Sequence, residues 1–143
     1  MIVPPDVVAP AVELVLQNMY FCEALFCGKG VLTPEAVGAA VTFNGSLRGE
    51  FRIAVSDVLA ARMTIDFLAL DDGGAFASQI EATVRELANI ACGAALSAWA
   101  PAANLHFSVP EGFSCGPAGA EFPCCFAVPG ERAEIGIEIR LDE

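Results

Sequence analysis

Basic side chains are scarce in this sequence, and it contains a single histidine. Seven Lys and Arg stand against 18 Asp and Glu, a formal net charge of −11. Nucleic-acid affinity depends largely on basic side chains that displace counterions from phosphates, so nucleic acid and anionic membranes are excluded as expected partners. One His leaves almost no scope for a Ser–His or Cys–His nucleophile. No glycine-rich nucleotide motif, P-loop, GxSxG or HExxH motif is present either.

A long hydrophobic run is also missing. The longest one, residues 90–100, ends at Pro101 and has about half of the ~20 residues that a membrane-spanning helix needs. The first residues lack a basic segment ahead of an apolar one, and Pro4 and Pro5 would interrupt a signal-peptide helix. With 143 residues, of which 55% are hydrophobic, the chain can bury one core. We therefore expect a cytoplasmic protein with a single domain over residues 1–143.

The cysteines form no CxxC pair, which with one His argues against a zinc site. They are Cys22, Cys27, Cys92, Cys115, Cys124 and Cys125. We expect them to be small buried apolar side chains that are kept reduced. A redox pair of Cys124 and Cys125 is the alternative, but neighbouring cysteines rarely adopt disulfide geometry and no basic residue is close in sequence to lower a thiol pKa.

Three segments have helical periodicity. The first, residues 11–26, follows Pro10 and is expected to stop at Gly28 and Gly30. The second, residues 58–70, has Ser56 as its expected N-cap and stops at residues 71–74 (DDGG). The third, about residues 77–100, is the longest. Its core-facing stripe consists of Ile80, Val84, Leu87, Ala91 and Ala95.

Alternating apolar residues predict the strands. Residues 41–43 and 51–55 flank a turn with Asn44 and Gly45, which is typical of a hairpin. Residues 105–109, 122–128 and 133–141 alternate as well, and the last of them has one apolar and one charged face. His106 is out of phase with its apolar neighbours and is expected to face solvent. The order of elements predicts an α+β fold, in which helices pack on an antiparallel or mixed sheet of about five to six strands.

The third helix carries a candidate site. Glu86 and Asn89 are three residues apart, so a helix places them on one face, about one turn apart. The same face continues through Ala82, Gly93 and Ser97, whose small side chains let another backbone approach. From spacing alone, a solvated polar face of an amphipathic helix is the favoured explanation of the pair.

The context of this pair resembles a known family. Residues 86–93 (ELANIACG) are similar to the E-x-x-N-x-x-x-G helix of the CheX-like branch of the CheC/CheX/FliY chemotaxis phosphatases. Upstream, residues 41–53 are similar to the family's glycine-bounded hairpin. Downstream, residues 105–110 resemble a family strand that ends in proline, and the chain closes with two strands as the family does. The resemblance covers nearly the whole chain.

The resemblance implies a chemistry and a partner. Glu86 and Asn89 fill the positions that act on the aspartyl phosphate of a phosphorylated CheY-like response regulator. Asn89 would orient the attacking water, because a neutral carboxamide both donates and accepts hydrogen bonds and brings no negative charge to the phosphoryl oxygens. Glu86 would pair with the regulator's active-site lysine. The chain itself would bind no cofactor or metal, since the regulator supplies the Mg²⁺.

The sequence departs from parts of the family pattern. Some members have a second ExxN motif in the first helix, but no Asn stands three residues after Glu13, so one site is expected, as in CheX. No further C-terminal domain of the FliY type is expected. The alternative function is a non-catalytic CheX-like module that docks a regulator or signalling partner. A third interpretation is a structural dimeric subunit. We also expect a homodimer, because the regular strand at residues 133–141 needs a partner along each edge and the resemblance implies pairing through a continued sheet.

Overall fold

The computed structural model describes residues 1–71, 73–131 and 133–142. Asp72, part of the stop predicted after the second helix, lies outside them. The elements are α1 (Pro5–Tyr20), β1 (Leu25–Leu32), β2 (Val37–Gly45), β3 (Gly49–Val55), α2 (Asp57–Leu68), α3 (Ala77–Trp99), β4 (Leu105–Phe107), β5 (Glu111–Ser114), β6 (Ala120–Ala127) and β7 (Glu134–Leu141). The predicted α+β class is confirmed. In the described part of the chain the sheet has seven strands. Five of them are those that the alternation predicts, and β1 and β5 are additional.

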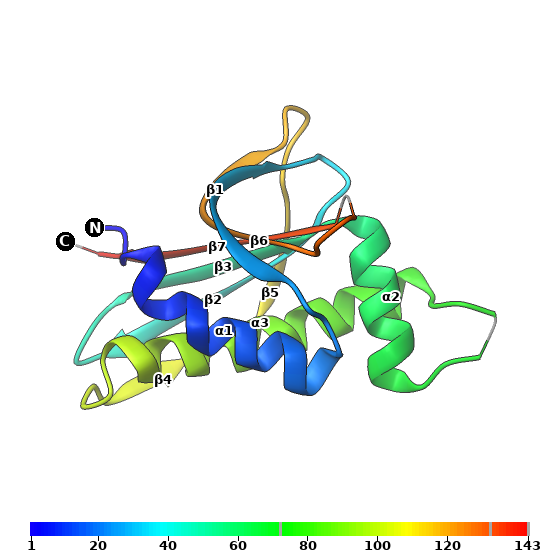
Figure 1. Ribbon diagram of the computed structural model, residues 1–143. Helices are drawn as coiled ribbons and strands as arrows, with labels where there is room; N and C mark the ends of the chain where they lie inside the picture. The colour runs from blue at the N-terminus through cyan, green and yellow to red at the C-terminus, as the bar shows by residue number, and fades with distance from the viewer. Residues whose placement is uncertain (72, 132, 143) are drawn as a thin grey trace.

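The strands form one antiparallel sheet in the order β1-β6-β7-β3-β2-β4, and β5 also pairs with β2. The helices lie on one side of this sheet (Figure 1). α1 and α3 pack against each other, and α3 also packs on β2 and β3. α2 packs on both other helices at one end of the layer (Figure 1). The outer surface of α3 therefore stays available for a site.

The first helix begins and ends six residues earlier than residues 11–26. Pro5 occupies its first position, where the missing amide is tolerated, and Pro10 lies inside it. The helix ends at Phe21, which adopts a left-handed conformation with φ of 54°, and the Cys22 amide donates to the Leu16 carbonyl at 2.9 Å. The C-terminus of α1 is thus capped by backbone hydrogen bonds without a glycine. A search of the sequence for Gly or Asn at helix ends does not detect such a cap.

Gly28 and Gly30, predicted as the helix stop, lie instead in the middle of β1. This strand pairs with β6, and its register shifts around both glycines. Gly28 has a φ of 98°, which side-chain-bearing residues rarely adopt. The irregularity interrupts the alternation and hides the strand from a pattern search.

Residues 105–114 run antiparallel along the outer edge of β2 in two pieces. β4 pairs with one end of β2 and β5 with the other. Between them, the Thr42 amide donates to Ser108 Oγ at 2.9 Å, and the Ser108 amide donates to the Thr42 carbonyl at 2.8 Å. Pro110 has no amide to donate, which is one reason why the predicted strand over residues 105–109 stops early and a second one begins.

The last strand, β7, lies inside the sheet and not at its edge. β3 pairs along one side of it over residues 135–141, and β6 pairs along the other side over residues 134–137. The N-terminus continues that second side, because Ile2 bridges Arg140 and the Val3 amide donates to the Ile139 carbonyl at 3.0 Å. The chain thus covers both edges of β7 itself. The argument that this strand seeks a second copy is therefore wrong, as is the idea that it forms a free edge of a structural subunit.

The two faces of the sheet have separate cores. Ile135, Ile137 and Ile139 of β7 point toward the helices and join the larger cluster. On the opposite face, Phe122 packs against Gly136, where an added Cβ would lie 2.6 Å from two of its ring carbons. Gly136 therefore provides the space for a fully buried aromatic ring on that face.

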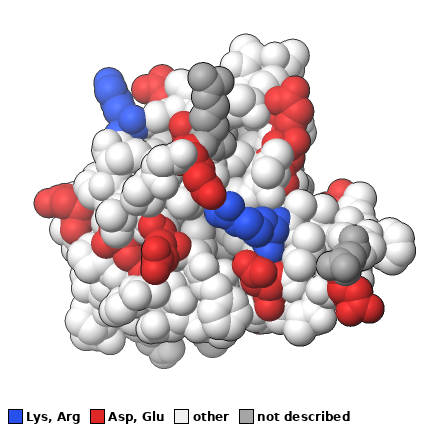
Figure 2. Space-filling model, turned by 45° about the vertical axis from the view of Figure 1, so that its right-hand side comes forward, with Lys and Arg blue, Asp and Glu red and all other residues white. Residues whose placement is uncertain are grey.

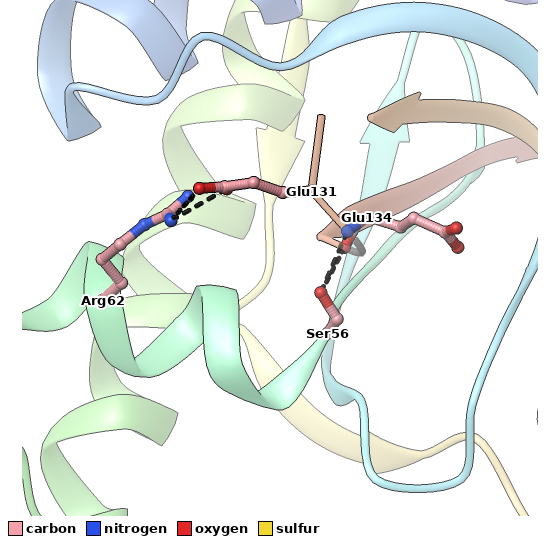
Figure 3. A network of polar contacts seen from close by, with 4 residues as sticks. All are labelled: Ser56, Arg62, Glu131 and Glu134. Carbon is pink, nitrogen blue, oxygen red and sulfur yellow. Dashed lines mark hydrogen bonds and ion pairs between the residues drawn. The ribbon is translucent and has the colours of Figure 1, made fainter. Parts of the chain in front are cut away.

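On the face of the molecule that Figure 2 shows, acidic side chains are spread widely and basic ones occur in few places. One basic residue anchors α2, because Arg62 Nη1 lies 2.9 Å from Glu131 Oε2 between β6 and β7 (Figure 3).

Ser56 stands at the predicted N-cap position of α2, but its hydroxyl does not bond the helix amides. It donates to the Glu134 carbonyl at 3.1 Å and accepts from the Glu134 amide at 3.0 Å (Figure 3). These contacts fix the start of α2 against β7.

Candidate functional site

The candidate site lies on α3, and the helix is oriented by its buried face. At its start, the Phe76 amide donates to Gln79 Oε1 at 2.8 Å, and Pro101 follows its last turn. Four of the five residues predicted to face the core are buried, with at most 2% exposure: Val84, Leu87, Ala91 and Ala95. Ile80, in the first turn, is half-buried and packs against the same core. The helical period therefore predicted the inner face correctly.

Glu86 and Asn89 are both exposed on the opposite face of α3. Their i, i+3 spacing makes them neighbours one turn apart. Within the described residues, neither side chain forms a hydrogen bond or an ion pair that would fix it in a structural role. A carboxylate and a carboxamide are thus exposed together on one face of the helix.

The surface around this pair is shallow, and the residues that form it have small side chains. Ala82 and Ser97 are exposed, and an added Cβ on Gly93 would meet no heavy atom within 4 Å. Beyond Gly93, a hollow of about 240 Å³ lies between the end of α3 and β4 and is lined in part by Phe107. The surface around Gly93 is therefore open, which leaves the close approach of another backbone a prediction.

Tyr20, the last residue of α1, is close enough to Glu86 to interact with its charge, and sequence reasoning did not detect it. Its ring is fully buried and stacks on Phe67 with centroids 4.9 Å apart. Its hydroxyl finds no hydrogen-bond partner within the part of the chain that the structure describes. Burial raises the pKa of Tyr20, and the negative charge of Glu86 raises it further. The Tyr20 hydroxyl is therefore neutral near physiological pH, and its pKa depends on the charge of Glu86. A lone tyrosine in an apolar helix offers no sequence signal for this proximity.

Glu13, which lies where some relatives carry a second motif, has a structural role. Its Oε2 accepts a hydrogen bond from the Phe26 amide at 2.8 Å and so links α1 to the start of β1. Asn18 of the same helix is exposed and lies outside any Glu-x-x-Asn spacing. One candidate site per chain follows, on α3.

The remaining candidate side chains lie as the sequence indicates, except Cys27, which was expected to be buried and is exposed. His106 is exposed on β4. Five of the six cysteines are buried, only Cys27 is exposed, and all are free thiols. Burial raises the pKa of Cys124 and of Cys125 to about 12, so both thiols are protonated near neutral pH. In the described ranges, no three His, Cys, Asp or Glu side chains are grouped so that they could hold a metal ion. No described helix is long and apolar enough to cross a membrane.

Comparison with known proteins identifies the family. The family model described as "Chemotaxis phosphatase CheX" matches residues 37–119, more than half of the chain. The chain belongs to the CheX family. No curated protein matches it at the sequence level. The matched segment includes β2, β3, α2 and α3, and so contains both Glu86 and Asn89.

Solved structures agree with this family fold. CheX from Vibrio vulnificus superposes with a TM-score of 0.73 at 18% identity, covering 96% of this chain and 95% of that one. The CheX–CheY–BeF3–Mg²⁺ complex from Borrelia burgdorferi gives 0.73 at 19% identity with 100% of both chains covered. FliY from Thermotoga maritima gives 0.65 at 11% identity, covering 94% and 84%. At these identities the likeness establishes the fold, which this CheX-family chain shares over nearly its whole length.

Proposed function

We propose that this chain hydrolyses the aspartyl phosphate of a CheY-like response regulator in chemotaxis or a related two-component pathway. The observation that carries the proposal is the joint exposure of Glu86 and Asn89 on the outer face of α3, within a chain of the CheX phosphatase family. The solved CheX–CheY complex of the Borrelia relative supports a regulator as the partner.

The proposed reaction is attack by water on phosphorus in line with the aspartyl oxygen. The new bond joins the water oxygen to phosphorus, and the bond between phosphorus and the aspartyl oxygen breaks, which leaves a carboxylate and inorganic phosphate. Asn89 holds the water, because its carboxamide accepts one hydrogen bond and donates another. Its neutrality avoids repulsion of the phosphoryl oxygens. Positioning of this kind supplies most of the catalysis in phosphoryl transfer.

Glu86 has a different role in this proposal. It forms an ion pair with the active-site lysine of the regulator and so fixes the orientation of the two proteins. The Mg²⁺ is held by the regulator, and it offsets charge on the phosphoryl group. The chain contributes the water-positioning amide and the docking surface.

The proposal is tested by phosphate release from purified, phosphorylated CheY-like regulators of the source organism. Asn89→Ala is expected to lower kcat by about 100-fold or more while the thermal melt stays unchanged, because the side chain is exposed and bonds to no described residue. Glu86→Ala is expected to raise KM instead. Asn18→Ala, an exposed helical asparagine on α1, is the matched control and should behave as wild type.

Two outcomes decide between the functions. Equal activity of wild type and Asn89→Ala would remove the catalytic role. Tight binding of a regulator without faster phosphate release would favour the non-catalytic docking module.

The homodimer stays a prediction, and it needs a surface other than β7. The outer strands of the sheet are β1 on one side and β4 with β5 on the other. Sedimentation at micromolar concentration in physiological salt tests it, since screening weakens repulsion between charges more than about 8 Å apart. A species of one chain mass at all concentrations would contradict the dimer.

A further inference from the structure

Arg85 is the only basic residue on α3, and its side chain pairs with no residue that the structure describes. It is half-buried, yet no described residue forms a hydrogen bond or ion pair with its guanidinium group. By contrast, Arg52, Arg62 and Arg140 lie 3.7, 2.9 and 3.2 Å from glutamate oxygens. A partly buried, unpaired guanidinium group in a chain of net charge −11 is available for an anionic partner.

The absent ion pair is notable because the spacing favours one. Glu81 precedes Arg85 by four residues, which is the favourable order for an ion pair on a helix. The two side chains instead both line a hollow of about 420 Å³ between α3 and strands β2 and β5. Gly38 and Phe113 form part of the opposite wall. Arg85 therefore lies at the rim of a hollow that is large enough to receive side chains of another protein.

This hollow flanks the candidate site. Asn89 lies one turn after Arg85, and helical side chains lean toward the N-terminus, so the carboxamide covers the turn that holds Arg85 and Glu86. By the same rule, Arg85 leans toward Glu81 and the hollow, away from Asn89. Arg85 is thus placed to contact protein beside the reacting group and not the group itself.

We propose that Arg85 is a specificity-determining residue that binds a surface carboxylate of the response regulator beside its phosphorylated aspartate. This inference rests on the proposed function, which makes the regulator the partner. A guanidinium group binds carboxylate with two parallel hydrogen bonds, whereas the overall charge of this chain repels acidic surfaces. Glu86 and Arg85 then present opposite charges at adjacent positions. Only one orientation of the regulator satisfies both, so the pair fixes the register of the complex.

Binding and turnover of Arg85 variants test this role. Arg85→Gln is expected to raise KM for the phosphorylated regulator about tenfold with kcat within about twofold of wild type. Dissociation constants are measured with the unphosphorylated regulator and with the regulator carrying beryllofluoride and Mg²⁺, and both should weaken by a similar factor. Arg85→Lys should restore part of the affinity, because it keeps the charge but loses the bidentate geometry. Thermal melts check that each variant is folded.

Two control variants separate a local contact from general electrostatics. Arg48→Gln removes another cation that no described residue pairs, on the exposed turn between β2 and β3, and should leave binding unchanged. Glu81→Gln removes the carboxylate that shares the hollow with Arg85, and it should strengthen binding if it has any effect.

Several results would overturn the inference. A fall in kcat at constant KM would place Arg85 at the reacting atoms. Weaker binding of the beryllofluoride form alone would assign the contact to the phosphoryl oxygens. If Arg48→Gln weakens binding of the regulator as much as Arg85→Gln does, the effect comes from the net charge of the chain and not from a local contact. If wild type binds a regulator but releases no phosphate, the proposed activity fails while the dissociation constants still test Arg85. If no regulator binds, both are wrong.

Discussion

Replacing Gly93 with alanine is expected to make the protein more stable. Gly93 lies in the interior of α3, where glycine loses more conformational freedom on folding than alanine does. The added Cβ meets no heavy atom within 4 Å, so no repulsion offsets the gain. The expected increase in the free energy of unfolding is about 0.5–1 kcal/mol. For a chain of this size, that corresponds to a rise in Tm of about 2–4 °C.

Gly136→Ala is the contrasting variant, in which the same chemical change meets a packed surface. Its Cβ would lie 2.6 Å from two ring carbons of Phe122 and 2.8 Å from Leu32 Cδ2. Phe122 and Leu32 are at most 1% exposed, so neither side chain can move into solvent. Overpacking of this kind reduces the free energy of unfolding by about 1–3 kcal/mol.

Urea denaturation and thermal melts of the two variants measure these effects. A Gly93→Ala chain that melts below wild type would refute the reasoning, because it would mean that another group occupies the space beside Gly93. A Gly136→Ala chain as stable as wild type would show that Phe122 does not pack where it is described. If the face around Gly93 receives the regulator, Gly93→Ala should also raise KM for the phosphorylated regulator. A gain in stability together with weaker binding distinguishes an interface glycine from a structural one.

Two further predictions follow from buried groups. Tyr20→Phe should leave stability unchanged or raise it by about 1 kcal/mol in urea denaturation, because it removes a buried hydroxyl that has no partner and keeps the ring; a loss of more than about 1 kcal/mol would mean that the hydroxyl is bonded. Stability should fall as pH rises above about 8.5, because burial raises the pKa of three thiols to about 12 while the unfolded chain ionises them near 8.5. These thiols belong to Cys92, Cys124 and Cys125. Denaturation between pH 7 and 10 under reducing conditions measures the slope, which is at most about 1.4 kcal/mol per thiol and pH unit, and a constant or rising stability would contradict it.

Local patterns predicted most of the fold because they arise from short-range geometry. The hairpin of β2 and β3, the last strand and the two later helices each have a clear period of 2 or 3.6 residues. α1 and β1 were misplaced where the local signal is ambiguous. The left-handed cap at Phe21 uses no glycine, and the glycine at position 28 serves a strand irregularity. β5 was missed because its four residues are mostly exposed and lack an alternating apolar face.

The sequence by itself determined that Glu86 and Asn89 share the outer face of α3, because the helical period and the apolar stripe set both faces of that helix. Only the tertiary structure decided what surrounds them. The charge of Glu86 acts on the pKa of Tyr20 because α1 packs on α3, and Arg85 lines a hollow because β5 pairs with β2. Likewise, β7 is internal because β3, β6 and the N-terminus cover its edges. These relations depend on contacts between residues that are distant in the chain, which periodicity within one segment does not encode.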